Sequence, residues 1–145
     1  MNSTLTSLDL RDNSAGSLAS LAAALRVHPA LTSLALDANE IADAGAIQLA
    51  EALRMGTALK RLLLADNRID DAGLAALSEA LKVKGTLETL DLRRNWFTDA
   101  GLAALAAALR RNTTLTCLDV SDNDVSDAGV AALVEALPEC CILRA

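Results

Sequence analysis

One pattern of leucines recurs five times along this chain and constrains its fold more than any other feature. The five segments align without gaps, and their starts lie 26, 28, 28 and 28 residues apart. Each reads L-x-x-L-x-L-x-x-N, with Val120 in place of the third leucine in the last copy. Self-similarity at a fixed period of 20–50 residues is typical of stacked repeats, in which neighbouring units share one continuous core.

Two kinds of periodicity follow one another inside each unit. The leucines of the opening segment alternate with other residues, which predicts a short, half-buried strand. In the third unit, Leu74, Leu77 and Leu81 then recur at i, i+3 and i+7, which places them on one face of a helix. We therefore expect each unit to contain one strand and one helix.

Two polar residues recur at fixed places, and we assign both to the structure rather than to chemistry. In the last four units an aspartate stands two residues before a glycine at the expected start of the helix, where it can cap exposed N–H groups and place negative charge at the positive end of the helix dipole. These aspartates are Asp43, Asp71, Asp99 and Asp127. An asparagine ends each strand pattern, where its amide can pair buried backbone groups. These asparagines are Asn13, Asn39, Asn67, Asn95 and Asn123.

The extended pattern L-x-x-L-x-L-x-x-N-x-(I/F/V)-x-D-x-G-x-x-x-L-x-x-x-L resembles the ribonuclease-inhibitor class of leucine-rich repeats, and NTTLTCLDVSDNDVSDAGVAALVEAL resembles the repeats of NOD-like receptors. The resemblance implies an α/β fold, a right-handed solenoid with a parallel sheet on its concave face and helices on its convex face. It also implies protein–protein binding. We expect a single domain, 1–145, with repeats at 5–30, 31–58, 59–86, 87–114 and 115–142 and a partial sixth from 143.

The two ends of the array depart from the pattern. The first repeat is two residues short, has Ser17 where the others have glycine and lacks the recurring aspartate. No polar capping unit precedes Leu5 or follows Leu143, although solenoid ends normally need one. Two interpretations stay open: the chain is a piece of a longer array, or its ends pair with something, including a second copy of the chain.

Composition and motifs argue against catalysis and against polyanionic partners. A net charge of −6 and a pI near 4.6 disfavour nucleic acid and anionic membranes. The chain has no phosphate-binding loop, no G-x-S-x-G and no H-E-x-x-H, and its single histidine, His28, is expected on a surface loop. Cys117, Cys140 and Cys141 lack metal-site spacing. We expect no enzyme activity, cofactor or metal and, without a visible signal peptide, a reducing cytoplasmic location.

The variable positions of the strands face outward and provide the candidate binding surface. A basic group gathers in the third and fourth repeats, flanked by acidic residues and one leucine. The residues are Lys60, Arg61, Arg68, Arg93 and Arg94, with Asp91, Asp119 and Leu63 beside them. A solvated surface of mixed charge that needs no partner is the alternative interpretation.

Trp96 is the sharper candidate, since 1% of the chain is aromatic and the other members of its column are polar. An exposed tryptophan beside arginines is typical of a binding hot spot, and half-buried packing is the alternative. Phe97 is assigned to the core.

We therefore predict a protein-binding module that uses the concave face and adjacent loops. One alternative is a self-associating scaffold that pairs through its uncapped ends. Another is a GTPase-regulatory protein, since Ran GTPase-activating proteins use similar repeats.

Overall fold

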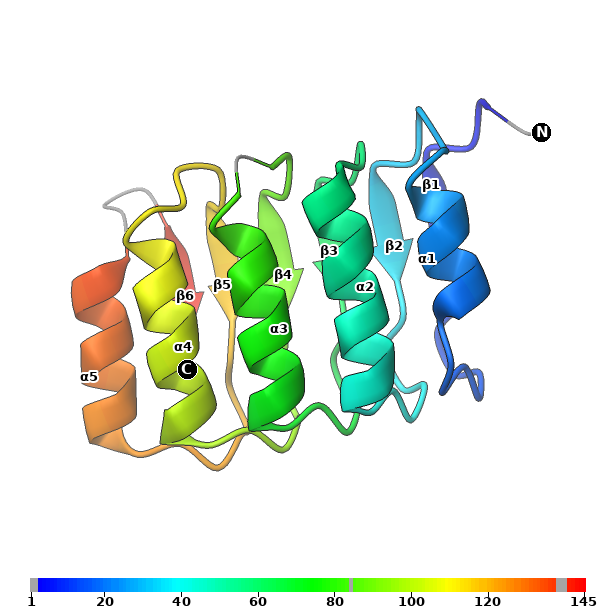
Figure 1. Cartoon of the computed structure of the whole chain (residues 1–145). Helices are drawn as coiled ribbons and strands as arrows, with labels where there is room; N and C mark the ends of the chain where they lie inside the picture. The colour runs from blue at the N-terminus through cyan, green and yellow to red at the C-terminus, as the bar shows by residue number, and fades with distance from the viewer. Residues whose placement is uncertain (1–2, 84, 138–140) are drawn as a thin grey trace.

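Strands and helices alternate along the chain and form two layers, with the helices in front of the sheet in Figure 1. The computed structural model describes residues 3–83, 85–137 and 141–145. The strands are β1 (Ser7–Asp9), β2 (Ser33–Ala35), β3 (Arg61–Leu63), β4 (Thr89–Asp91), β5 (Cys117–Asp119) and β6 (Ile142–Arg144). The helices are α1 (Ala19–Leu25), α2 (Asp43–Met55), α3 (Asp71–Leu81), α4 (Asp99–Leu109) and α5 (Asp127–Ala136). The predicted unit of one strand followed by one helix is confirmed.

All the strands lie parallel in one sheet, in the order β1-β2-β3-β4-β5-β6. Equivalent positions of neighbouring units pair directly, so Leu62 lies between Leu34 and Leu90. Every column of the sequence alignment therefore becomes a row of side chains across the sheet. In the last strand Leu143 pairs with Leu118. This strand begins at Ile142. The pairing gives Leu143 the place of the second leucine of a repeat, whereas we expected the sixth repeat to start at 143.

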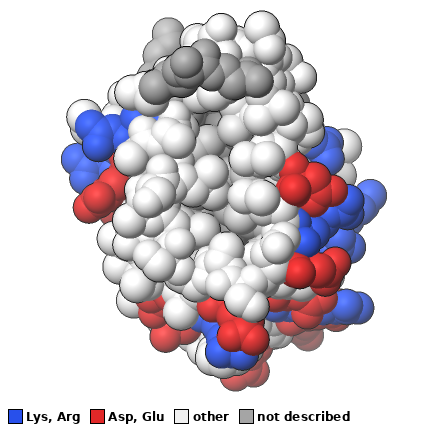
Figure 2. Space-filling view, turned by 90° about the vertical axis from the view of Figure 1, so that its right-hand side faces the viewer, with Lys and Arg blue, Asp and Glu red and all other residues white. Residues whose placement is uncertain are grey.

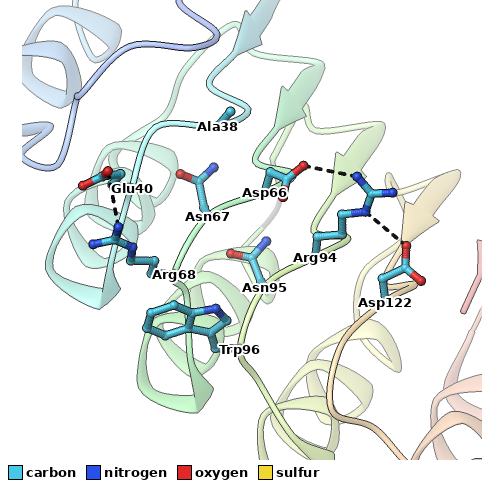
Figure 3. A pocket seen from close by; sticks show the side chains of 9 residues that line it. All are labelled: Ala38, Glu40, Asp66, Asn67, Arg68, Arg94, Asn95, Trp96 and Asp122. Atoms are coloured by element: carbon cyan, nitrogen blue, oxygen red, sulfur yellow. Dashed lines mark hydrogen bonds and ion pairs between the residues drawn. The ribbon is translucent and has the colours of Figure 1, made fainter.

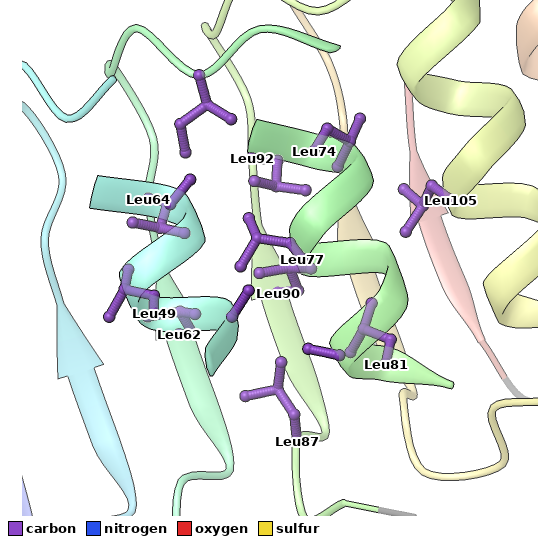
Figure 4. Close-up of a cluster of buried hydrophobic side chains, with 14 of the residues drawn as sticks. Leu49, Leu62, Leu64, Leu74, Leu77, Leu81, Leu87, Leu90, Leu92 and Leu105 are labelled. Carbon is purple, nitrogen blue, oxygen red and sulfur yellow. The ribbon is translucent and has the colours of Figure 1, made fainter. Parts of the chain in front are cut away.

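The core is aliphatic and lies between the two layers (Figure 4). In the third unit, Leu62 and Leu64 of the strand segment and Leu74 and Leu77 of α3 belong to one buried cluster, and each of these side chains is at most 1% exposed. Phe97 is fully buried, as its column predicts. Burying one such side chain is worth about 1.5–3 kcal/mol, so stacked copies of a leucine-rich layer provide a core without other aromatic residues.

The connections between the layers form two opposite edges of the molecule (Figure 1). We call the turns that follow the strands, residues 10–18, 36–42, 64–70, 92–98 and 120–126, the strand-exit edge. We call the C-terminal ends of the helices and the turns that follow them, residues 26–32, 54–60, 82–88 without 84, and 110–116, the helix-exit edge. At the strand-exit edge, the residue before each asparagine adopts a left-handed φ of 52–56° and turns the chain away from the sheet. These residues are Asp12, Ala38, Asp66, Arg94 and Asp122.

Candidate partner-binding surface

The asparagine ladder joins neighbouring repeats beneath the strand-exit edge. The Nδ2 of Asn67 donates hydrogen bonds of 3.0–3.1 Å to two carbonyl oxygens of its own repeat and to the carbonyl oxygen of Leu36 in the preceding repeat. Its Oδ1 accepts from the backbone N–H groups of Asn39 (3.1 Å) and Ile41 (2.9 Å). Asn13 is exposed, and within the described part of the chain its side chain bonds only to carbonyl oxygens of its own turn.

Three of the four recurring aspartates bond to the start of the next helix, whereas we expected each to cap its own. The carboxylate of Asp71 accepts from the backbone N–H groups of Thr98 and Gly101 and from the Thr98 hydroxyl, each at 2.8 Å. Asp43 accepts from the backbone N–H groups of Asp70 and Gly73. Asp99 accepts from the backbone N–H and the hydroxyl of Ser126. The reason is position: each aspartate is the first helical residue, and the side chain that caps α3, α4 or α5 belongs to the residue before it.

These contacts shift the pKa values of the aspartates in different directions. Burial opposes ionisation of Asp71, but the hydrogen bonds from Thr98 and Gly101 outweigh it and hold the pKa below its ordinary value of 3.8. The Ser126 hydroxyl and N–H lower the pKa of Asp99 in the same way. The pKa of Asp43 is instead raised, by burial and by the neighbouring carboxyl group of Asp70.

The lowered pKa of Asp71 gives a testable pH dependence. We expect Asp71→Asn to lower the free energy of unfolding by about 1 kcal/mol near neutral pH, because an amide oxygen accepts weaker hydrogen bonds than a carboxylate. Since the folded-state pKa lies below that of the unfolded chain, the stabilisation is complete above 3.8 and is lost as the pH falls through the folded value. Urea unfolding of parent and variant should therefore converge as the pH falls below 3.8.

Asp127→Asn is the matched control for this measurement. It removes the same charge from the first position of a helix, but the Asp127 carboxylate makes no hydrogen bond to another described residue. A difference between parent and Asp71→Asn that persists unchanged in acid would contradict the explanation.

The predicted basic residues do not form a surface of free positive charge. Lys60 lies 2.8 Å from Glu88, and Arg93 lies 3.2 Å from Asp91. Arg61 is exposed on the sheet and forms no ion pair with any residue in the described ranges. This arrangement matches the alternative of a mixed-charge surface, because most of the cations have a carboxylate beside them.

A groove of about 560 Å³ lies at the strand-exit edge and crosses several repeats (Figure 3). It is lined by Ala38, Glu40, Asp66, Asn67, Arg68, Arg94, Asn95, Trp96 and Asp122. The structure thus brings together three of the predicted binding residues, Arg68, Arg94 and Trp96. The two asparagines in the lining hold the backbone beneath it.

Trp96 is 61% exposed in this groove, so the side chain is not packed in the half-buried way that was the alternative. Its backbone N–H donates to the carbonyl oxygen of Ile69 at 2.9 Å. The guanidinium carbon of Arg68 lies 5.9 Å from the centre of the ring, within the range of a cation–π interaction. Glu40 pairs with Arg68 at 3.3 Å. The indole is therefore oriented by its neighbours while much of its surface faces solvent (Figure 3).

Arg94 is held on the other side of the groove by two carboxylates. Its Nη1 lies 3.4 Å from Asp66 and its Nε lies 3.3 Å from Asp122, in the preceding and the following repeat (Figure 3). Hydrogen bonds from the guanidinium group to Asp122 and Asp66 raise the pKa of Arg94 above its ordinary value. The three exposed side chains form a bridge across three repeats, and their polar atoms stay accessible to a partner.

The remaining predicted residues lie on the sheet and differ in what they expose. Leu63 is half-buried in β3. Asp119 is buried, and its Oδ1 accepts from the backbone N–H and the hydroxyl of Ser121 at 3.1 and 2.6 Å. Asp91 is half-buried, and its burial raises its pKa although neighbouring Arg93 lowers it. Of these residues, Asp119 offers the least surface to a partner.

Residues with possible reactive chemistry are placed apart from the groove. Among the described residues no three His, Cys, Asp or Glu side chains are arranged to hold a metal ion. His28 is half-buried, and its Nδ1 accepts from the backbone N–H of Leu31 at 3.1 Å, so it supports its loop rather than lying free on the surface as expected. Cys117 is a half-buried free thiol, and Cys140 lies outside the described residues.

The repeat architecture agrees with comparison to known proteins. A family model described as "Leucine Rich repeat" matches residues 2–14, 27–50, 57–78, 86–106 and 111–134. The chain belongs to the leucine-rich repeat family. No curated protein matches it in sequence. Among solved structures, this leucine-rich repeat protein is similar to "Leiomodin-1 Actin-Binding Site 2 (ABS2)", with 19% identity, coverage of 91% of this chain and 78% of that chain, and a TM-score of 0.70. At that identity the likeness shows the fold.

Three functional candidates in the groove were missed from the sequence: Glu40, Asp66 and Asp122. Each occupies the same repeat column as Arg68 or Arg94 in an adjacent repeat, which is the signal that could have identified them. Members of one column become neighbours in space when leucine-rich repeats stack. Opposite charges at equivalent positions of consecutive repeats therefore predict an ion pair.

No described helix is both long and apolar enough to cross a lipid bilayer. Leucine-rich repeat proteins generally act by binding other proteins, which agrees with an exposed groove built from several repeats.

Proposed function

We propose that this leucine-rich repeat protein is a non-catalytic binding module that contacts a protein partner through its concave sheet face and the Trp96 groove. The observation that carries the proposal is Trp96: the side chain is 61% exposed, lies 5.9 Å from a guanidinium group and is in a column whose other members are polar. The core does not require it. Tryptophan and arginine are the residues most enriched in hot spots of protein interfaces.

The size of the surface favours joint use of the sheet and the groove. Six strands spaced about 4.8 Å apart span about 24 Å, and their exposed side chains alone offer less than the roughly 800 Å² that a standard interface takes from each partner. The groove adds area next to the sheet. Arg93, Asp91, Leu63, Arg61 and Lys60 then extend the contact surface from the Trp96 groove across the sheet, and Asp119 contributes little.

Substitution of Trp96 tests the proposal. We expect Trp96→Ala to weaken binding of a partner captured from cell lysate by about tenfold or more, because loss of a hot-spot tryptophan typically costs about 2 kcal/mol. Arg94→Glu should weaken it as well, because it reverses the charge between two carboxylates. Since Trp96 is the only tryptophan, its fluorescence emission should also shift when the purified partner binds.

Ile47→Ala is the control, because Ile47 is an exposed apolar residue of α2, in the helix layer opposite the sheet. Circular dichroism should show that all three variants remain folded. Retention of the partner by both Trp96→Ala and Arg94→Glu would refute the assignment of the site. Actin is one purified candidate to include, since the structural neighbour is named an actin-binding site.

Finer features of this proposal rest on the repeat pattern. We place the repeats in the ribonuclease-inhibitor class and nearest to those of NOD-like receptors, supported by the 28-residue spacing and by α-helices in the second half of each unit. We also place the protein in the cytoplasm, because its thiols have no disulfide-framework spacing. A GTPase-regulatory role rests on resemblance alone, and a GTPase stimulation assay tests it.

Self-association through the ends is a second candidate, and one observation favours it. Seen from the end formed by β1 and α1, the molecule shows an uncharged face, with charged residues on its flanks and lower rim (Figure 2). Leu5 is 40% exposed at the start of the array and Ile142 is 63% exposed in β6. Light scattering tests this candidate, and a monomer at high concentration would refute it.

A further inference from the structure

The helix-exit edge carries a repeated pair of residues that is not part of the Trp96 groove. A basic residue stands at the end of each of the first four helices: Arg26, Arg54, Lys82 and Arg110. In the first three repeats an apolar residue follows it and is 47–66% exposed: Val27, Met55 and Val83. The equivalent position of the fourth repeat is Arg111. Because the repeats stack in register, both columns run along this edge.

The helix dipole accounts for the basic column but not for the apolar one. Cations at helix C-termini are stabilising without any partner. Single exposed apolar residues are also common. Here, however, three of them occupy the same position of consecutive repeats, beside the cations. Neither explanation accounts for an apolar column that runs beside a basic column.

The cations of this edge are also less neutralised than those near the sheet. Lys60 and Lys82 form ion pairs with Glu88 and Glu79. Arg54, Arg110 and Arg111 are exposed and form no ion pair with any residue in the described ranges. The cations of the Trp96 groove, Arg68 and Arg94, each form an ion pair with a carboxylate. Most of the cations that form no ion pair in the described ranges therefore lie at the edge opposite Trp96.

Two adjoining hollows lie within this edge. One, of about 130 Å³, has an apolar lining that includes Leu53, Leu81, Val83 and Leu87. The second, of about 330 Å³, is lined in part by Lys82 and Arg111 and shares Val83 with the first. An apolar hollow with cations at its margin suits a peptide segment in which an apolar side chain is flanked by carboxylates.

Hydrogen bonds fix the floor of these hollows before anything binds. The Nδ2 of Asn112 donates to the carbonyl oxygen of Leu81 at 2.8 Å, and its Oδ1 accepts from the backbone N–H groups of Thr114 (3.0 Å) and Leu115 (2.8 Å). The Thr86 hydroxyl lies 2.6 Å from the carbonyl oxygen of Leu59. A partner segment would meet a preorganised surface, which lowers the entropy lost on binding.

We propose that the helix-exit edge binds an extended acidic segment of a partner protein. One apolar side chain of the segment enters the hollow at Val83, and its carboxylates pair with Arg54, Arg110 and Arg111. Neighbouring helix axes lie about 8–10 Å apart, so the row from Arg26 to Arg110 is about 25–30 Å long, which about eight or nine extended residues cover. The chain as a whole has a net charge of −6, so a long polyanion would be repelled by the acidic surface beyond this edge. A short acidic segment is therefore favoured over a nucleic acid or a membrane.

Fluorescence polarisation with a labelled peptide tests this second surface. The probe is a peptide of about nine residues made of Asp and Glu with one central leucine, titrated with the full chain. We expect saturable binding that weakens as salt is added. Arg54→Glu combined with Arg110→Glu should weaken it about tenfold or more, because like charges then face each other. Val83→Ser should weaken it about fivefold by removing apolar contact.

The matched control is Arg61→Glu, which reverses an exposed cation without an ion pair on the sheet face. It should leave peptide binding unchanged, as should Trp96→Ala, so this test and that of the Trp96 groove can fail separately. No binding by the parent, equal weakening by Arg61→Glu, or equal binding of an Asp/Glu peptide without leucine would each overturn the proposal. Cosedimentation with phosphatidylserine vesicles in the absence of peptide binding would overturn it in favour of a membrane surface.

Discussion

Asn67→Ala is expected to lower the free energy of unfolding by about 3 kcal/mol, because removing its amide leaves five hydrogen bonds unmade. Asn67 is 4% exposed, so water does not readily replace the lost partners. The groups left unpaired belong to two repeats, since Leu36, Asn39 and Ile41 precede it in the sequence. A buried donor or acceptor without a partner typically costs about 1–3 kcal/mol, and relaxation of the turn reduces the total.

Asn13→Ala provides the matched control within the same column. Asn13 is exposed, and its described side-chain bonds reach only the carbonyl oxygens of Leu10 and Arg11 in its own turn. We expect it to cost less than about 1 kcal/mol. Urea unfolding followed by circular dichroism measures both variants. Equal unfolding midpoints for Asn67→Ala and the parent would refute the role of the asparagine ladder. Equal losses of unfolding free energy for the two variants would show that the loss does not come from contacts between repeats.

The strand, the helix and the core could be predicted because each depends on residues within one repeat. Leu62 and Leu64 alternate, Leu74 and Leu77 share a helical face, and Phe97 stands in a column of apolar residues. Stacking changes those assignments little, because a core residue of one repeat lies beside the equivalent residue of the next. The spacing alone therefore indicates which side chains are buried.

Contacts between repeats were harder to predict, since they depend on how closely two turns approach. Asp71 was expected to cap its own helix, and it binds the start of the next one. Arg94 was grouped with other cations, and it bridges Asp66 and Asp122. In both cases the residue type and its column were correct, but the partner lies about 28 residues away. Exposure of Trp96 could be predicted, because it follows from the polarity of its column.

The glycine of the repeat provides the second large effect. Gly101→Ala is expected to cost about 2–3 kcal/mol. Helix propensity alone predicts the opposite sign, since alanine inside a helix is favoured over glycine by about 1 kcal/mol. A Cβ at Gly101, however, would lie 2.6 Å from the Oδ1 of Asp71 and 3.1 Å from the Cδ2 of Leu74. The Asp71 carboxylate cannot withdraw without losing its bonds to Thr98 and to the Gly101 N–H itself.

Combining Gly101→Ala with Asp71→Ala identifies the cause of the loss. If the close approach of the Asp71 carboxylate makes glycine necessary, Gly101→Ala should lower the free energy of unfolding by at least about 1 kcal/mol less in the Asp71→Ala background. This difference is the coupling energy that a double-mutant cycle measures between two residues in contact. Gly16→Ala is the control, since nothing lies within 4 Å of a Cβ at that position; it should be neutral or slightly stabilising. A cost of Gly101→Ala that is the same with and without Asp71 would instead assign the loss to Leu74 and Phe97 in the core. Coupling of the expected size would show that the recurring aspartate and the glycine 30 residues after it act as one contact between repeats.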